Sequence, residues 1–169
     1  MVDKLNNLEV FFDYVCPYCY KAHKFLLELL PLFENVNVVW RPCESHPRPE
    51  RYGPHSDLCI KGYYYILDKK LDVMEYHSLI YSAVYVDKID IENKFELAEY
   101  ISGFIDKTEF LNALDNLIYD KKLSEGNNYA YIKYKIKVVP SYRLNSNQLN
   151  SIENIGVTKE QIKDLLMKI

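Results

Sequence analysis

Two cysteines separated by two residues constrain this chain more than any other feature. The motif Cys16-Pro17-Tyr18-Cys19 follows an apolar segment, residues 8–12, and precedes a segment, residues 22–30, with the apolar spacing of a helix. A sulfur in the first turn of a helix faces unpaired backbone N–H groups and the positive end of the helix dipole, which favour the thiolate. Cys16 is therefore predicted to be the reactive sulfur. Cys19, one turn further along and more shielded, is predicted to be the resolving thiol.

The two residues between the cysteines are expected to tune this chemistry. Pro17 suits the first position of a helix, where its missing N–H has no helical partner to lose. Tyr18 brings no positive charge to the Cys16 thiolate, so backbone amides are left as its main stabilisers. We therefore expect a lowered pKa for the Cys16 thiol. We also expect the Cys16–Cys19 redox couple to be less oxidising than the couples of strong periplasmic oxidants.

Composition excludes several classes of partner. The chain has 169 residues, of which 49% are hydrophobic, and a formal net charge of -3. It can bury a core within one domain, and it has no basic surplus for nucleic acid or an anionic membrane. No stretch approaches the roughly 20 apolar residues that span a bilayer, and residues 1–7 lack the pattern of a secretory signal. We expect a cytoplasmic protein without nucleic-acid or membrane partners.

The other cysteines leave two alternatives to dithiol redox chemistry. Four cysteines are too few for a disulfide scaffold, and in a reducing compartment a C-x-x-C motif is usually redox-active or metal-binding. A zinc site needs two further ligands, and Cys43, Cys59, His46 and His55 have no paired spacing, so no metal is expected. We expect Cys43 and Cys59 to be small buried residues. The alternative is a second redox pair that relays electrons to Cys16.

Several polar side chains near the motif have both an ordinary and a functional interpretation. For Asp13 we favour a turn-forming or solvated carboxylate, with proton transfer to Cys19 as the alternative. For His23, one helical turn beyond Cys19, we favour a surface position because the redox scheme does not need it. Solvated positions, with binding of a glutathione or peptide carboxylate as the alternative, are expected for Arg41, Arg48 and Arg51.

The middle of the chain predicts helices. Residues 36–41 form a second strand, and the helix before it makes a parallel βαβ unit the expected arrangement. Residues 42–54 contain four prolines and predict a surface loop. Helical spacing then recurs at 56–67, 71–86, 95–104, 108–119 and 124–134. Two of these helices have N-cap chemistry, in Asn93 with Glu96 and in Asp106 with Glu109.

Strand character returns near the end of the chain. Residues 136–144 and 151–155 predict a hairpin across a polar turn, residues 145–150. Thr158 with Gln161 forms a capping box for a final helix. The apolar face of that helix is expected to contain Ile162, Leu165, Leu166 and Ile169.

Three segments carry a resemblance to a known family: residues 11–20 around the dithiol, 39–42 at the second strand, and 138–142. Together they resemble the thioredoxin fold of the DsbA family, and most closely its FrnE-like branch. Neighbours of that branch are 2-hydroxychromene-2-carboxylate isomerases and kappa-class glutathione transferases. In these neighbours the position that matches Cys16 looks like a serine that works with glutathione. The presence of both Cys16 and Cys19 favours dithiol redox chemistry over glutathione-assisted isomerisation.

The resemblance implies a fold and a site. The fold is α/β and thioredoxin-like, β-α-β then β-β-α, in a single domain, residues 1–169, with 56–134 as a helical insertion. The Val139–Pro140 peptide bond is expected to be cis, to face Cys16 and to pair with an extended substrate chain.

The expected activity is thiol-disulfide exchange, as an oxidoreductase or isomerase, with protein or small-molecule substrates. No bound cofactor is expected, and glutathione is a candidate redox partner. The alternatives are a glutathione-dependent transferase or isomerase of the same superfamily and a non-catalytic peptide-binding module.

Overall fold

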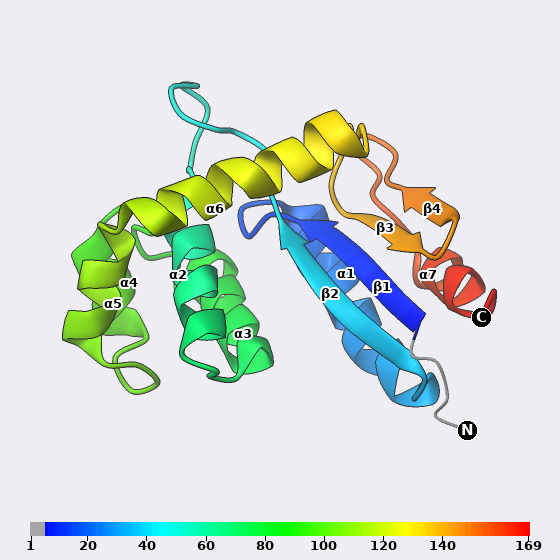
Figure 1. Ribbon diagram of the computed structural model, residues 1–169, viewed down its shortest axis with the longest axis horizontal. Helices are drawn as coiled ribbons and strands as arrows, with labels where there is room; N and C mark the ends of the chain where they lie inside the picture. The colour runs from blue at the N-terminus through cyan, green and yellow to red at the C-terminus, as the bar shows by residue number, and fades with distance from the viewer. Residues whose placement is uncertain (1–5) are drawn as a thin grey trace. The chain divides into compact units, whose positions relative to one another are not determined.

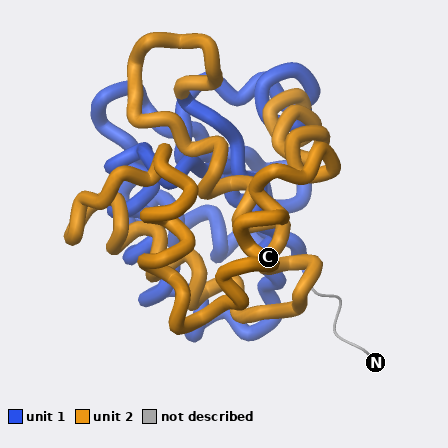
Figure 2. Tube along the Cα trace, turned by 90° about the vertical axis from the view of Figure 1, so that its left-hand side faces the viewer, with its two compact units in different colours: residues 1–45, 129–169 blue, residues 46–128 orange. Residues whose placement is uncertain are grey.

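The computed structural model describes residues 6–169 and divides them into two compact units. The first unit contains the chain up to Ser45 together with residues 129–169, and the second is His46–Asn128 (Figure 2). The expectation that residues 1–7 carry no secretory signal falls partly on residues 1–5, which lie outside the described residues. The expected domain boundaries, with 56–134 as an insertion, stay a prediction.

The first unit contains a mixed sheet with helices (Figure 1). Its described elements are β1 (Asn6–Phe12), α1 (Pro17–Leu29), a 3-10 turn (Leu30–Leu32), β2 (Val36–Pro42), a π-helix (Tyr129–Lys133), β3 (Ser141–Leu144), β4 (Asn147–Asn150) and α7 (Lys159–Leu166). The described strands lie in the order β2-β1-β3-β4. β1 is parallel to β2 and antiparallel to β3, so the expected βαβ unit and the element order are confirmed.

Both faces of β1 are covered, which explains why its sequence lacks polar alternation. On one face Phe12 contacts Trp40 of β2 at 5.7 Å between ring centroids, and Trp40 contacts His23 of α1 at 5.8 Å. On the other face Phe11 stacks on Tyr129 of the π-helix at 6.0 Å. β1 therefore ends inside the core, and the chain that leaves it carries the dithiol.

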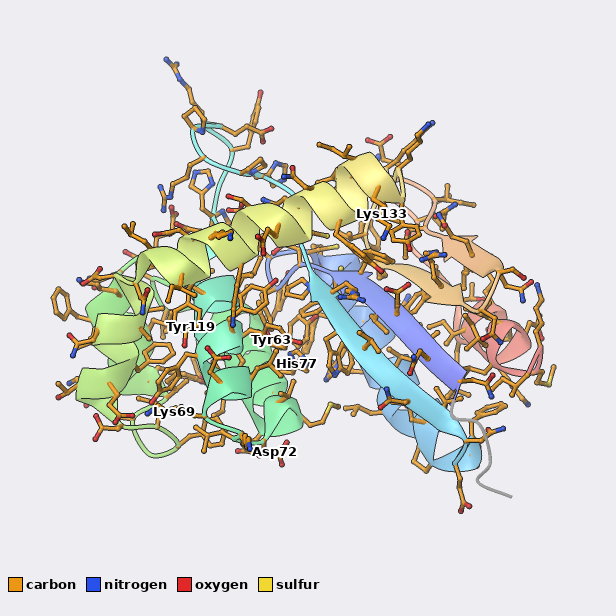
Figure 3. All side chains as sticks on the ribbon, in the orientation of Figure 1. Tyr63, Lys69, Asp72, His77, Tyr119 and Lys133 are labelled. Atoms are coloured by element: carbon orange, nitrogen blue, oxygen red, sulfur yellow. The ribbon has the colours of Figure 1, made fainter. Side chains whose placement is uncertain are left out.

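The described elements of the second unit are helices: α2 (Asp57–Asp68), α3 (Val73–Tyr85), α4 (Lys94–Tyr100), α5 (Lys107–Leu114) and α6 (Leu117–Asn128). The side chains of Asn93 and Asp106 accept backbone hydrogen bonds at the starts of α4 and α5, so these two N-caps are confirmed. Tyr63 of α2 and His77 of α3, both labelled in Figure 3, are buried and stack at 5.9 Å between ring centroids. Within residues 6–169, no helix is both long and apolar enough to cross a membrane.

The expected helices 108–119 and 124–134 are wrong at their boundaries. α5 ends at Leu114, and the Asn116 side chain accepts the Ile118 N–H at 2.9 Å at the start of α6. An asparagine that starts a helix is readily read as the interior of the preceding one, because the apolar spacing continues across it. The segment after α6 is π-helical, a form that apolar spacing does not distinguish from an α-helix.

The expected hairpin is also displaced. β3 begins only at Ser141, directly after Pro140, which has no N–H to give to a strand ladder. β4 is the polar segment 147–150 rather than 151–155, because the turn is short and Asn145 adopts a left-handed φ of 54°. The capping box of Thr158 is confirmed, whereas Ile169 lies beyond α7 and is 42% exposed.

Candidate active site

The dithiol occupies the first turn of α1, as the sequence predicts. Cys16 is the N-cap residue, with φ -95° and ψ 115°, and Pro17 is the first helical residue. The Cys19 N–H donates to the Cys16 sulfur at 3.3 Å, so the sulfur takes the position of a capping oxygen. The sulfur of Cys16 is thereby aimed at the unpaired amides of the helix start.

The two thiols differ in accessibility and acidity. The pKa of Cys16 is lowered by its hydrogen bond with the Cys19 thiol and by the amide N–H groups of Cys19 and Tyr18, which outweigh its partial burial. Cys19 is 2% exposed, and burial raises the pKa of its thiol well above its ordinary value. One sulfur can therefore be an accessible thiolate while the other stays a protonated thiol.

The Val139–Pro140 segment lies beside the reactive position. Its peptide bond is cis, and the Cys16 thiol donates to the Val139 carbonyl oxygen at 3.5 Å, so both expectations about this geometry are confirmed. The Ser141 hydroxyl donates to the Val138 carbonyl at 2.7 Å and holds this segment in place. Val139 is 6% exposed, and its pairing with a substrate chain stays a prediction.

Asp13 is buried beneath the dithiol, so the expectation of a solvated carboxylate is wrong. Its turn-forming role is present, because one carboxylate oxygen accepts the Val15 N–H at 3.3 Å and the other accepts the Ser45 N–H at 2.6 Å. Its own backbone N–H donates to the Cys19 sulfur at 3.5 Å. The signal for burial was present in the sequence: Asp13 directly follows a strand that is apolar on both faces.

His23 is also buried, at 7% exposure, so its expected surface position is wrong. It shares a helix face with Cys19 and Leu26, and that face packs on the sheet. Burial lowers the pKa of His23 to about 4. The imidazole is therefore neutral at physiological pH.

Cys43 and Cys59 are both fully buried, as expected for small interior residues. Cys43 follows β2 in the first unit, and burial raises the pKa of its thiol to about 12. Cys59 lies in α2, in the second unit. His46 pairs with Glu50, and its carbonyl oxygen lies 2.8 Å from a ring nitrogen of His55. Among the described residues, no three metal-binding side chains form a group.

Arg41 is partly exposed, with 38% of its side chain accessible, and it is also held by neighbours in the first unit. Its guanidinium donates to Glu9 at 2.9 Å and stacks on the ring of Tyr129 at 4.2 Å. Arg143 binds the other oxygen of Glu9 at 2.8 Å. Glu9 thus joins β2 and β3 through β1, and its apolar surroundings in the sequence gave no sign of this role.

The two remaining arginines lie in the loop at the start of the second unit. Arg48 binds Asp57 and Glu92 and remains half exposed. Arg51 is exposed. Neither residue belongs to the unit that carries the dithiol.

Comparisons with known proteins show matches over most of this chain. A family model described as a DSBA-like thioredoxin domain matches residues 7–163. DsbA from Pseudomonas aeruginosa is 17% identical, with a TM-score of 0.72, over 98% of this chain and 84% of that chain. A probable DsbA oxidoreductase from Streptomyces coelicolor is 13% identical, with a TM-score of 0.80, over 96% of this chain and 89% of that one.

A solved 2-hydroxychromene-2-carboxylate isomerase is also similar. It is 14% identical, with a TM-score of 0.71, over 96% of this chain and 93% of that chain. At these identities the likeness to solved structures shows the fold alone.

Proposed function

This chain belongs to the DSBA-like thioredoxin domain family, and we propose that it exchanges disulfides with thiol substrates through Cys16 and Cys19. The expected α/β thioredoxin-like fold is confirmed, while the placement in the FrnE-like branch stays a prediction. The observation that carries the proposal is the asymmetry of the two thiols. Cys16 is accessible with a lowered pKa, whereas Cys19 is buried with a raised one.

The reaction proceeds in two exchanges. The Cys16 thiolate attacks one sulfur of a substrate disulfide, the substrate S–S bond breaks, and the leaving sulfur takes a proton from solvent. Cys19 then loses its proton and attacks the Cys16 sulfur of the mixed disulfide, which releases the second substrate thiol. Two electrons pass from the protein dithiol to the substrate, and a Cys16–Cys19 disulfide remains. Run in reverse, the same steps oxidise a substrate dithiol.

The proposal needs no bound cofactor or metal. A thiol of the glutathione class is the proposed redox partner that returns the Cys16–Cys19 disulfide to the dithiol. Protein or small-molecule disulfides are the proposed substrates, and the cytoplasm is the proposed compartment. Pro17 and Tyr18 are proposed to tune the couple, and the backbone of Val139, next to Pro140, to align a substrate chain beside the Cys16 sulfur.

The test separates attack from resolution. Cys16→Ser is expected to abolish reduction of a protein disulfide, because no thiolate remains to attack. Cys19→Ser is expected to accumulate a mixed disulfide through Cys16, detectable by mass spectrometry and reversed by dithiothreitol. Cys59→Ala, a buried thiol of the second unit, is the matched control and is expected to retain turnover.

Two outcomes would replace the proposal. Normal turnover by Cys19→Ser with glutathione would indicate a monothiol route, as expected of a transferase or isomerase that uses glutathione. Substrate-peptide binding that survives Cys16→Ala, in a protein without reductase activity, would indicate a peptide-binding module.

A further inference from the structure

A glycine outside the dithiol motif lies against its second intervening residue. Gly156, in the turn between β4 and α7, has a left-handed φ of 81°. A side chain built at this position would begin 3.0 Å from Cδ1, 3.2 Å from Cβ and 3.3 Å from Cγ of Tyr18. These distances are shorter than most real Cβ contacts, so a side chain here would push the base of the Tyr18 ring away by a few tenths of an ångström.

The turn that carries Gly156 is anchored on both sides. The Gly156 N–H donates to the Ile152 carbonyl at 2.8 Å, and the Ile152 N–H donates back to the Gly156 carbonyl at 3.3 Å. Ser151, which precedes Ile152, is buried and donates its hydroxyl hydrogen bond to the Pro140 carbonyl. Pro140 follows Val139, whose carbonyl accepts from the Cys16 thiol. The backbone of Gly156 is therefore a fixed surface against which Tyr18 rests.

Tyr18, which contacts Gly156, also lies beside the reactive sulfur of Cys16. Tyr18 is the second residue of α1, and its N–H and that of Cys19 are the backbone groups that stabilise the Cys16 thiolate. We infer that Gly156 is a positioning residue for the reactive thiol: its bare backbone seats the Tyr18 ring, and this contact holds the first-turn amides under the Cys16 sulfur. The inference rests on the proposed dithiol function.

Other groups near the sulfur also affect its titration. Cys19 faces Cys16 from α1 and Asp13 faces it from the end of β1, and both interact with its charge. Cys43 beyond β2 and Tyr142 of β3 also interact with the Cys16 charge. A substitution at Gly156 alters none of these charges. A change in the pKa of Cys16 would then come from the geometry of the first turn.

A double-mutant cycle between Gly156 and Tyr18 tests the inference. In Gly156→Ala the new methyl group displaces Tyr18, so the pKa of Cys16 should rise and the thiolate fraction below that pKa should fall about threefold or more. In the Tyr18→Ala background the same substitution still meets the Cβ of residue 18 but no ring, so it should raise the pKa by less. The pKa is measured from thiolate absorbance and from the pH dependence of alkylation.

Gly103→Ala is the matched control, because a side chain there meets nothing within 4 Å and lies in the second unit. It should leave the pKa of Cys16 unchanged. A wild-type pKa in Gly156→Ala would overturn the inference. An equal shift in both Tyr18 backgrounds would also overturn it, since backbone strain at a positive φ would then be the cause. If Gly156→Ala does not fold, Tyr18→Ala alone should raise the pKa, and a wild-type value would overturn the inference.

The cycle does not depend on turnover. If wild-type Cys16 titrates with a lowered pKa but reduces no disulfide, the proposed function fails while the role of Gly156 can still be measured. If reduction proceeds and the cycle shows no coupling, the proposed function stands and the role of Gly156 fails.

Discussion

At the scale of single residues, the site depends on placing two identical side chains in opposite environments. Cys16 caps a helix and receives amide hydrogen bonds, while Cys19, three residues later, faces the sheet. The difference arises because residues one turn apart differ in depth when a helix begins at the edge of a core. The thiolate form is thereby favoured at the more exposed of the two sulfurs.

Selective alkylation should reveal this difference. At mildly acidic pH, iodoacetamide should label Cys16 of the reduced protein well before Cys19, Cys43 or Cys59, because its thiol has a lowered pKa and the other three sulfurs are buried. Peptide mapping by mass spectrometry gives the order of labelling. Earlier labelling of Cys43, whose thiol is buried, would contradict the assignment of the reactive sulfur.

The buried imidazole of His23 should make stability depend on pH. Its pKa is lowered from 6.5 to about 4, so the unfolded chain binds the proton more readily than the folded one. The contribution of neutral His23 is complete above pH 6.5 and is lost as the pH falls from 6.5 to 4, by up to about 3 kcal/mol. Urea unfolding across this range should show a shallower loss in His23→Leu than in the wild type. An equal loss of unfolding free energy with falling pH in the two proteins would contradict the lowered pKa of His23.

Residue-scale prediction from sequence succeeded where spacing alone decides the outcome. The position of Cys16 at a helix start follows from the strand, the motif and Pro17. The burial of His23 did not follow, because it depends on which helix face meets the sheet and how deeply. The contact of Gly156 with Tyr18 joins segments that are far apart in the chain, so no local sequence pattern predicts it.

At the scale of elements, α2 shows how closely helices of the second unit approach one another. A side chain at Gly62 would begin 2.2 Å from the Tyr76 hydroxyl of α3 and 2.9 Å from the Phe110 ring of α5. The Tyr76 hydroxyl donates to the Cys59 carbonyl at 2.6 Å and cannot move without losing that bond. Gly62 therefore marks a crossing where three helices meet.

Gly62→Ala should destabilise the protein although alanine is the better helix former. We expect a loss of about 1–3 kcal/mol from overpacking, which exceeds the gain of up to 1 kcal/mol from helix propensity. Chemical denaturation gives the free energy of unfolding, and Gly103→Ala, in open space, serves as the control. A Gly62→Ala protein that is more stable than the wild type would show that α3 and α5 move away from α2 at little cost.

Element prediction was sound for long periodic segments and weak at their ends. The strands β1 and β2 and the helices α1 to α4 follow from apolar spacing and caps. The division between α5 and α6 depends on the side chain of Asn116, and β4 has a polar sequence because an edge strand needs little apolar surface. These features depend on single hydrogen bonds or on tertiary position.

At the scale of the whole molecule, the Cys16 thiolate should contribute to global stability. Its folded pKa lies below the ordinary value of 9.0, so the contribution is complete above pH 9 and is lost as the pH falls through the folded pKa. Between these limits the reduced wild type should gain stability over Cys16→Ser by about 1.4 kcal/mol per pH unit at most. Serine keeps a capping oxygen and does not titrate in this range. A difference independent of pH would contradict the lowered pKa.

The order of the strands also bears on how the chain is made. β1 is central, with its Leu8 opposite Val38 of β2 and opposite Leu144 of β3. On a ribosome, β1 and β2 emerge early, and residues 46–128 follow before β3 exists. The nascent chain therefore carries a central strand with one open edge, which can pair with strands of other chains. A product truncated before Ser141 keeps that edge open, whereas a chain that includes β3 and β4 closes it with its own hairpin.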